Sequence, residues 1–129
     1  MSYDNPLRVT YSFAAMDFGT TKTRYIRGPA GKRGRVVDAT LSVTTLFTAV
    51  TTGAHIEVGP TGTLTAALDW TLTTNAANST ANASGQSGAI KTGAASFLAA
   101  DTDALVTFLA PTGGSPAGIA DVHLTVEWF

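Results

Sequence analysis

The sequence has no cysteine, little charge and no long apolar run, and each absence excludes a class of protein. Without cysteine, a disulfide framework, a thiolate metal site and a cysteine nucleophile are all excluded. No stretch approaches the ~20 apolar residues that cross a bilayer, and the polar residues 1–6 do not resemble a secretory signal. We therefore expect a protein made in the cytoplasm, with no membrane partner and no redox chemistry.

Charged residues make up only 13% of the chain, whereas about 25% is usual for a domain. The net charge of −1 conceals an uneven distribution along the sequence. Residues 1–35 hold seven basic and two acidic residues, a net of +5, and residues 36–129 hold one basic and seven acidic residues, a net of −6. Such a chain can meet copies of itself, or an acidic protein surface, with opposite charges facing.

Apolar and polar residues alternate along segments that Gly, Pro, Asn and Ser clusters separate, which is the pattern of β-strands. We expect strands at 8–13, 23–27, 35–47, 55–58, 63–72, 104–110 and 119–129. In the longest of these, alternation places on one face the residues Val37, Ala39, Leu41, Val43, Thr45 and Phe47. Ile90 is the only large apolar residue within 73–93, so we expect a long polar surface loop there.

A chain of 129 residues fits a single domain with one core. Seven or eight strands joined by turn-rich connections, with one long loop, are typical of an all-β fold. The prediction is a two-sheet antiparallel sandwich, jelly-roll-like in its arrangement, over residues 1–129.

Candidate catalytic and metal-binding residues are few. Both histidines, His55 and His123, lie at outward positions of predicted strands. Strand pairing could bring them together with Glu57, Asp101 or Asp121 as metal ligands, but nothing in the spacing requires it. The pair Asp101 and Asp103 lacks the other ligands of a calcium loop. No G-x-S-x-G motif occurs, and nothing selects one pair of acids as a hydrolytic centre. We expect no enzymatic activity, no cofactor and no metal.

Six basic residues cluster near the start of the chain and form the candidate partner-contact site: Lys22, Arg24, Arg27, Lys32, Arg33 and Arg35. The Gly-rich stretch among them has only two residues between its first glycines, unlike a phosphate-binding loop. Tyr25 is the one aromatic residue in the run and the pI is about 6.0, which argues against nucleic acid. Guanidinium groups suit an acidic protein surface, where each can pair with a carboxylate through two hydrogen bonds.

Three stretches resemble the small capsid decoration, or cement, proteins of tailed bacteriophages. They are the basic turn 25–38, which runs into a Ser/Thr-rich strand, the segment 101–114 and the terminal Val-His-Leu-Thr-Val-Glu-Trp-Phe. The resemblance implies a jelly-roll-like sandwich that assembles as a homotrimer on the virion surface. It also implies binding to the outside of the major capsid protein lattice, where the protein clamps neighbouring subunits and stabilises the shell.

The rival hypothesis is a carbohydrate-binding or host-adhesion module displayed on the virion. An exposed Trp70, with tyrosines beside loop acids, would favour it. Under the capsid hypothesis the basic segment contacts the partner, while Trp128 packs in the core and Phe129 lies in the core or between copies.

Overall fold

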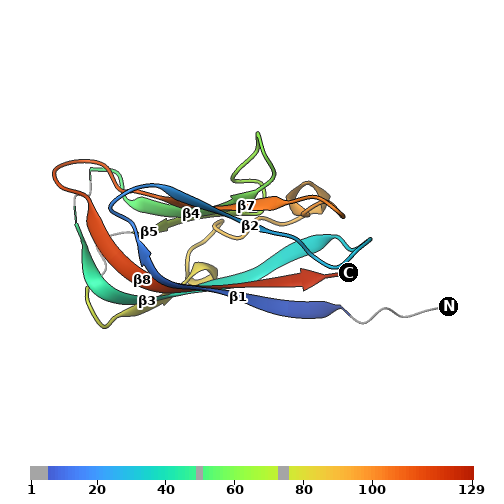
Figure 1. Cartoon of the computed structure of the whole chain (residues 1–129), viewed down its shortest axis with the longest axis horizontal. Helices are drawn as coiled ribbons and strands as arrows, with labels where there is room; N and C mark the ends of the chain where they lie inside the picture. Colours follow the sequence, from blue (N-terminus) through green and yellow to red (C-terminus); the bar gives the residue numbers. More distant parts are fainter. Residues whose placement is uncertain (1–5, 49–50, 73–75) are drawn as a thin grey trace.

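The computed structural model describes residues 6–48, 51–72 and 76–129. Within these residues the chain forms eight strands and two single-turn 3₁₀ helices, and the strands pack as two layers (Figure 1). The elements are β1 (Leu7–Asp17), β2 (Lys22–Ile26), β3 (Gly34–Thr48), β4 (Ala54–Gly59), β5 (Leu68–Leu72), β6 (Thr80–Asn82), η1 (Ala83–Gly85), η2 (Ala94–Ser96), β7 (Ala104–Leu109) and β8 (Ala117–Trp128). Neither helix in this part of the chain has the length or the apolar character needed to cross a membrane.

The strands form two antiparallel sheets of four. Sheet A has the order β1-β8-β3-β6 and sheet B the order β2-β7-β4-β5. Four antiparallel pairs, β1·β8, β2·β7, β3·β6 and β4·β5, are nested in the sequence, as if one long hairpin with its tip between β4 and β5 had been rolled up. This nesting is the jelly-roll arrangement, and it confirms the predicted all-β two-sheet sandwich.

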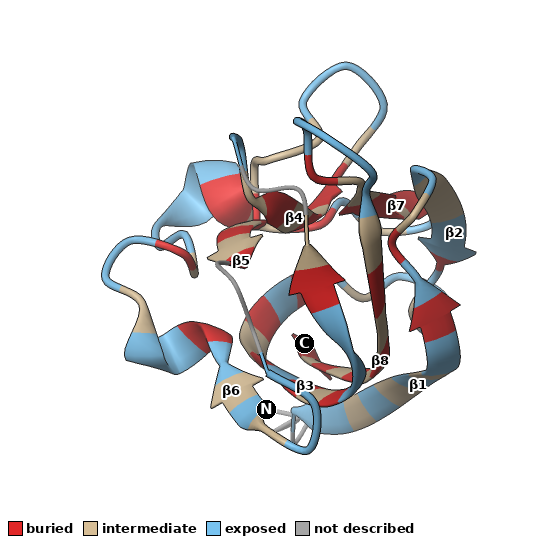
Figure 2. Ribbon diagram, turned by 90° about the vertical axis from the view of Figure 1, so that its left-hand side faces the viewer, coloured by how far each residue is buried: buried red, intermediate tan, exposed pale blue. Residues whose placement is uncertain are grey.

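The core lies between the two sheets and is filled by every second residue of the central strands. Figure 2 shows buried and less buried residues alternating along β8. Phe18, Phe47 and Phe108 meet at its centre, with ring centroids 4.9 Å apart for Phe18 and Phe47 and 5.8 Å apart for Phe18 and Phe108. Each of these side chains is at most 1% exposed, and full burial of such a side chain contributes about 1.5–3 kcal/mol.

The predicted inner face of β3 is wrong at its first residue. Val36 is buried and Val37 is only half-buried, because the register with β8 shifts between Val36 and Asp38. A β-bulge inserts one residue and so reverses which side chains face inward before it. Thr45 is exposed, beyond a second shift between Val43 and Thr45.

The predicted strand 63–72 is too long at its start, since β5 begins at Leu68. Before it the chain turns, with hydrogen bonds from the Thr63 N–H to the Pro60 carbonyl (3.0 Å) and from the Ala66 N–H to the Thr63 carbonyl (3.1 Å). Leu64 and Ala66 alternate by chance within this turn and are only half-buried.

The segment 73–93, predicted as one polar loop, contains β6 and η1 in its described part; residues 73–75 lie outside the described residues. Polar contacts position this segment. The carboxylate of Asp38 accepts hydrogen bonds from the N–H and the hydroxyl of Ser84, each at 3.1 Å. Two backbone hydrogen bonds join the start of the segment to Val43: the Asn78 N–H donates to the Val43 carbonyl (2.8 Å), and the Val43 N–H donates to Ser79 (2.9 Å). A three-residue strand held in this way leaves no apolar pattern in the sequence.

The same segment also covers the outer edge of β5. The Asp69 N–H donates to the Ala89 carbonyl at 2.9 Å. The side-chain amide of Gln86 then takes the place of a strand's peptide group: its Nε2 donates to the Thr71 carbonyl (3.0 Å) and its Oε1 accepts from the Thr71 N–H (3.1 Å). Covered edges resist pairing with other chains.

Candidate functional site

At one end of the sandwich β1 and β3 begin and β8 ends (Figure 1). Five of the eight basic residues lie on β1, on β3 or in the loop between β2 and β3 at this end. We call this surface the basic rim; it comprises Arg8, Arg27, Lys32, Arg33 and Arg35. Four of these were predicted. Arg8 was not among the predicted contact residues, although the alternation of the first strand places it on the same face as Thr10, with Val9 on the other.

The other two predicted contact residues lie elsewhere. The amine of Lys22 donates to the Asp17 carbonyl at 2.7 Å and to the Thr20 hydroxyl at 3.0 Å, and so ties the turn between β1 and β2. Arg24 lies within β2, and its guanidinium donates to the neighbouring Thr23 carbonyl at 3.1 Å. The structure therefore does not bring Lys22 and Arg24 into the basic rim.

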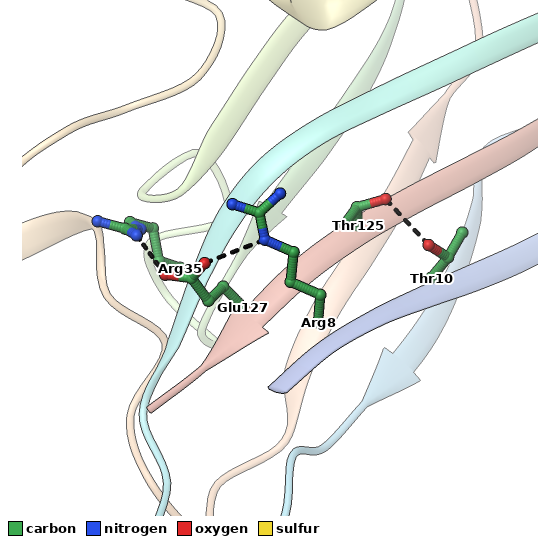
Figure 3. A network of polar contacts seen from close by, with 5 residues as sticks. All are labelled: Arg8, Thr10, Arg35, Thr125 and Glu127. Atoms are coloured by element: carbon green, nitrogen blue, oxygen red, sulfur yellow. Dashed lines mark hydrogen bonds and ion pairs between the residues drawn. The ribbon is translucent and has the colours of Figure 1, made fainter. Parts of the chain in front are cut away.

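Glu127 anchors two arginines of the rim (Figure 3). It is the cross-strand partner of Arg8 on β1 and of Arg35 on β3, so the three side chains form a row on the outer face of sheet A. Arg8 Nε donates to Glu127 Oε2 at 3.1 Å, and Arg35 Nη2 donates to Oε1. The carboxylate side chain is 9% exposed, whereas the two arginine side chains are 64% and 50% exposed. The guanidinium groups are thus fixed in direction while they still face solvent.

The electrostatics of this row favour the charged carboxylate. Desolvation raises the pKa of Glu127, but the hydrogen bonds and positive charges of Arg8 and Arg35 together outweigh it, and the pKa lies below its ordinary value. The row carries two positive charges and one negative charge, so it remains positive overall. A hydrogen-bonded pair of hydroxyls, Thr10 and Thr125 (3.1 Å), continues the polar face beside it (Figure 3).

Two aromatic rings hold the guanidinium group of Arg33 in place. Its guanidinium carbon lies 5.3 Å from the ring centroid of Phe97 and 5.0 Å from that of Phe129. The two rings meet edge to face with centroids 5.1 Å apart. Such cation–π contacts are worth about 0.5–1 kcal/mol each at exposed sites. Arg33 is exposed, so its hydrogen-bond donors remain accessible to a partner.

Two acidic residues fold back onto the basic loop. Arg27 Nε donates to Asp103 Oδ1 at 2.8 Å, and the Gly31 N–H donates to Asp101 Oδ1 at 2.9 Å. These carboxylates, which we considered as part of a calcium loop, position the loop between β2 and β3. They also balance part of the positive charge of the rim.

The side chain of Trp128 packs against the loop between β2 and β3. Its side chain is 1% exposed, which confirms the prediction that it packs in the core, and its Nε1 donates to the Tyr11 hydroxyl at 3.1 Å. Gly28 and Gly34 lie directly against the indole, where neither has room for a Cβ. The two ends of the loop that carries Lys32 and Arg33 therefore pack closely against the buried indole of Trp128. Phe129 is half-buried against Phe97.

The two histidines lie in different sheets, His55 on β4 and His123 on β8. Both occupy outward positions between buried neighbours, as predicted, so they face away from each other across the sandwich. His123 Nδ1 lies 2.9 Å from the Ser12 hydroxyl. A metal site that uses both imidazoles is excluded by this geometry.

Trp70 is 3% exposed and packs in the core. It borders a hollow of about 330 Å³ between β5 and β6, which Gln86 also lines. A sugar-binding site of the kind we considered needs an exposed indole face for stacking, and Trp70 does not offer one.

No protein-family model, curated protein or solved structure matches this chain. The fold therefore defines the class of protein, a jelly-roll β-sandwich with a basic rim at one end.

Proposed function

We propose that this protein is a non-enzymatic structural protein that binds the outside of a phage capsid and stabilises the shell by bridging neighbouring capsid subunits. The observation that carries the proposal is the basic rim, whose guanidinium groups are exposed but held in place by Glu127 and by two phenylalanine rings. Preorganised side chains lose little conformational entropy on binding. Arginines fixed in this way suit carboxylates on a capsid surface.

The outer edge of β1 supports the self-association part of the proposal. Within the described residues β1 pairs only with β8, in unbroken register from Leu7↔Trp128 to Phe13↔Val122. Leu7 is 51% exposed. A strand edge of this length without a partner in the described residues can pair with a strand of another chain. We assign it to contacts between copies, which in the proposed homotrimer repeat around a symmetry axis.

Binding of several linked copies to the repeating capsid lattice accounts for the stability of the proposed complex. A protein that binds only the mature shell stabilises that state by its own binding free energy. When several copies are linked, contacts that are weak alone hold together, because each later contact forms at high effective concentration. Each basic rim therefore needs only modest affinity for the lattice.

Binding to purified phage capsids tests the proposal. Arg33→Gln should reduce the amount of protein retained at least about tenfold, since an Arg in a bidentate pair contributes a charge-assisted hydrogen bond. The matched control is Lys91→Gln, because Lys91 is exposed and is the only basic residue after Arg35. Raising the salt from about 0.05 M to about 1 M should release the wild type. Equal retention of both variants, or full retention at high salt, would overturn the role of the rim.

The mass in solution tests the self-association separately. Analytical ultracentrifugation should show a species of three times the chain mass of 13.2 kDa. Leu7→Lys should shift it toward monomer, because Leu7 is exposed at the outer edge of β1 and a lysine on an edge strand opposes pairing with another chain. A wild type that stays monomeric at all concentrations would contradict the homotrimer, without bearing on the rim.

A further inference from the structure

Three side chains that can bind a metal ion lie together on the outer face of sheet B, away from the basic rim. They are His55 and Glu57 of β4 and Asp69 of β5. In the part of the chain that the structure describes, these three form the one group of His, Cys, Asp or Glu whose ligand atoms all lie within 4.8 Å of one another. Each residue is half-buried, so an ion can reach the group from solvent.

Two like charges of this group lie next to each other. Glu57 and Asp69 are direct cross-strand partners, so two carboxylates face each other across the strand pair. Like charges in this position destabilise a sheet. Burial, and next the charge of Asp69, raise the pKa of Glu57, while His55 lowers it to a smaller extent. His55 Nδ1 lies 3.1 Å from Asp69 Oδ1, so the imidazole is already turned toward the carboxylates.

A buried hydroxyl next to the group provides an independent observation. Thr107 of β7 is 5% exposed, and its Oγ1 has no hydrogen-bond partner. It is the cross-strand partner of Glu57 on the other side of β4. Its neighbours Val106 and Phe108 point into the core, so Thr107 lies on the same outer face as Glu57. A buried hydroxyl without a partner is costly, and a water bound to an ion beside Glu57 would supply one.

We propose that His55, Glu57 and Asp69 bind a Zn²⁺ ion, with a water as the fourth ligand hydrogen-bonded to Thr107. One imidazole nitrogen and two carboxylate oxygens suit a first-row transition ion, whereas Mg²⁺ and Ca²⁺ prefer oxygen ligands alone. Zinc with three protein ligands and a water is four-coordinate, with bonds of about 2.0–2.2 Å. Ligand atoms within 4.8 Å of one another reach that geometry by small side-chain rotations.

The proposed ion would join β4 to β5 on the face opposite the Glu127 row. It would neutralise the two facing carboxylates and stabilise the folded state in proportion to its occupancy. The proposed metal site does not include the basic rim, and its test is independent of the capsid-binding function proposed above.

Isothermal titration of the chelator-treated full chain with ZnCl₂ at neutral pH tests the site. We expect one ion per chain. His55→Ala and Asp69→Asn should each weaken binding at least about tenfold, and Thr107→Val should weaken it by about tenfold as a residue that holds the bound water. The matched control is His123→Ala, which removes the other imidazole from the opposite sheet and should leave the affinity unchanged.

Circular dichroism of each variant checks that it is folded. If His55→Ala is unfolded, Asp69→Asn carries the test, since it keeps the size of the side chain. The proposal would be overturned by no binding at about 1 mM Zn²⁺, well above any specific affinity for such a site. It would also be overturned by equal binding to wild type and Asp69→Asn, or by Mg²⁺ binding as tightly as Zn²⁺.

Discussion

Replacing Gly34 by alanine should destabilise the protein through a single contact, with the ring of Trp128. A Cβ at Gly34 would lie 2.5 Å from Cζ3 and 2.8 Å from Cε3 of the indole, whereas carbon atoms pack at about 3.5–4.0 Å. The ring or the loop must therefore move by about 1 Å. The ring is fixed by burial and by its hydrogen bond to Tyr11. Overpacking of this kind costs about 1–3 kcal/mol.

A matched control separates this contact from the general effect of adding a methyl group. Gly34 does not have a positive φ, and neither does Gly85, where a Cβ would meet nothing within 4 Å. Gly85→Ala should therefore change the free energy of unfolding by no more than about 0.5 kcal/mol. Trp128→Phe provides the second arm, because a smaller ring leaves room for the added methyl group. In that background Gly34→Ala should cost at least about 1 kcal/mol less than in the wild type.

Urea denaturation followed by far-UV circular dichroism measures all four variants: Gly34→Ala, Gly85→Ala, Trp128→Phe and the double variant. Circular dichroism is used because the two variants that lack Trp128 have a changed fluorescence signal. In thermal denaturation each kcal/mol should correspond to about 3–5 °C for a chain of this size. Equal stabilities of Gly34→Ala and Gly85→Ala would refute the reasoning. Strict additivity of Gly34→Ala and Trp128→Phe would also refute it, because the cost would then not come from the ring.

Three further predictions concern the charged rows and the covered edge. The pKa of Glu127 is lowered in the folded state, so its contribution to stability is present above the unfolded-state pKa of about 4.3 and is lost as the pH falls through the lower folded-state pKa. The melting temperature of Glu127→Gln should therefore lack this part of the decline at acid pH. Identical pH profiles of the wild type and Glu127→Gln would count against the arginine contacts. In the presence of chelator, Glu57→Gln should stabilise the protein at neutral pH by about 0.2–1 kcal/mol, because it removes the carboxylate that faces the carboxylate of Asp69 across the strand pair. An unchanged melting temperature would mean that solvent already screens the pair. Gln86→Ala should lower the free energy of unfolding by about 1–3 kcal/mol and speed amide hydrogen exchange at Thr71, whose N–H and carbonyl lose their side-chain partner. A Thr71 amide that stays protected would show that another group covers this edge.

Sequence patterns predicted the strands that carry a period-two apolar face. Along β8 the alternation places Val122, Leu124, Val126 and Trp128 inward, and all four are buried. Each such position depends only on its neighbours in the chain, because successive side chains of a strand point to opposite faces. The overall sandwich follows from the number of these strands and the turns between them.

Features that depend on partners far away in the sequence could not be predicted. The bulge that turns Val36 inward exists because β3 has to follow the register of β8, and no local signal marks it. Arg8 and Glu127 are 119 positions apart, so their pairing depends on β1 and β8 closing the sheet. The metal-binding group likewise exists only because β4 pairs with β5 in the register that sets Glu57 opposite Asp69.

The uneven charge along the sequence does not give a molecule with one basic and one acidic half, because the jelly roll returns acidic residues to the basic segment. Pairing of the first strand with the last brings Glu127 between two arginines. The segment just before β7 brings Asp101 and Asp103 to the loop after β2. Much of the +5 of residues 1–35 is therefore compensated within the fold. The rim differs from the rest of the surface in the direction of its side chains. The guanidinium group of Arg33 lies against two aromatic rings, and so its donors are available to an external acid. Capsid binding should accordingly depend more on single arginines of the rim than on the net charge of the protein, and adding a lysine elsewhere on the surface should not compensate for the loss of Arg33.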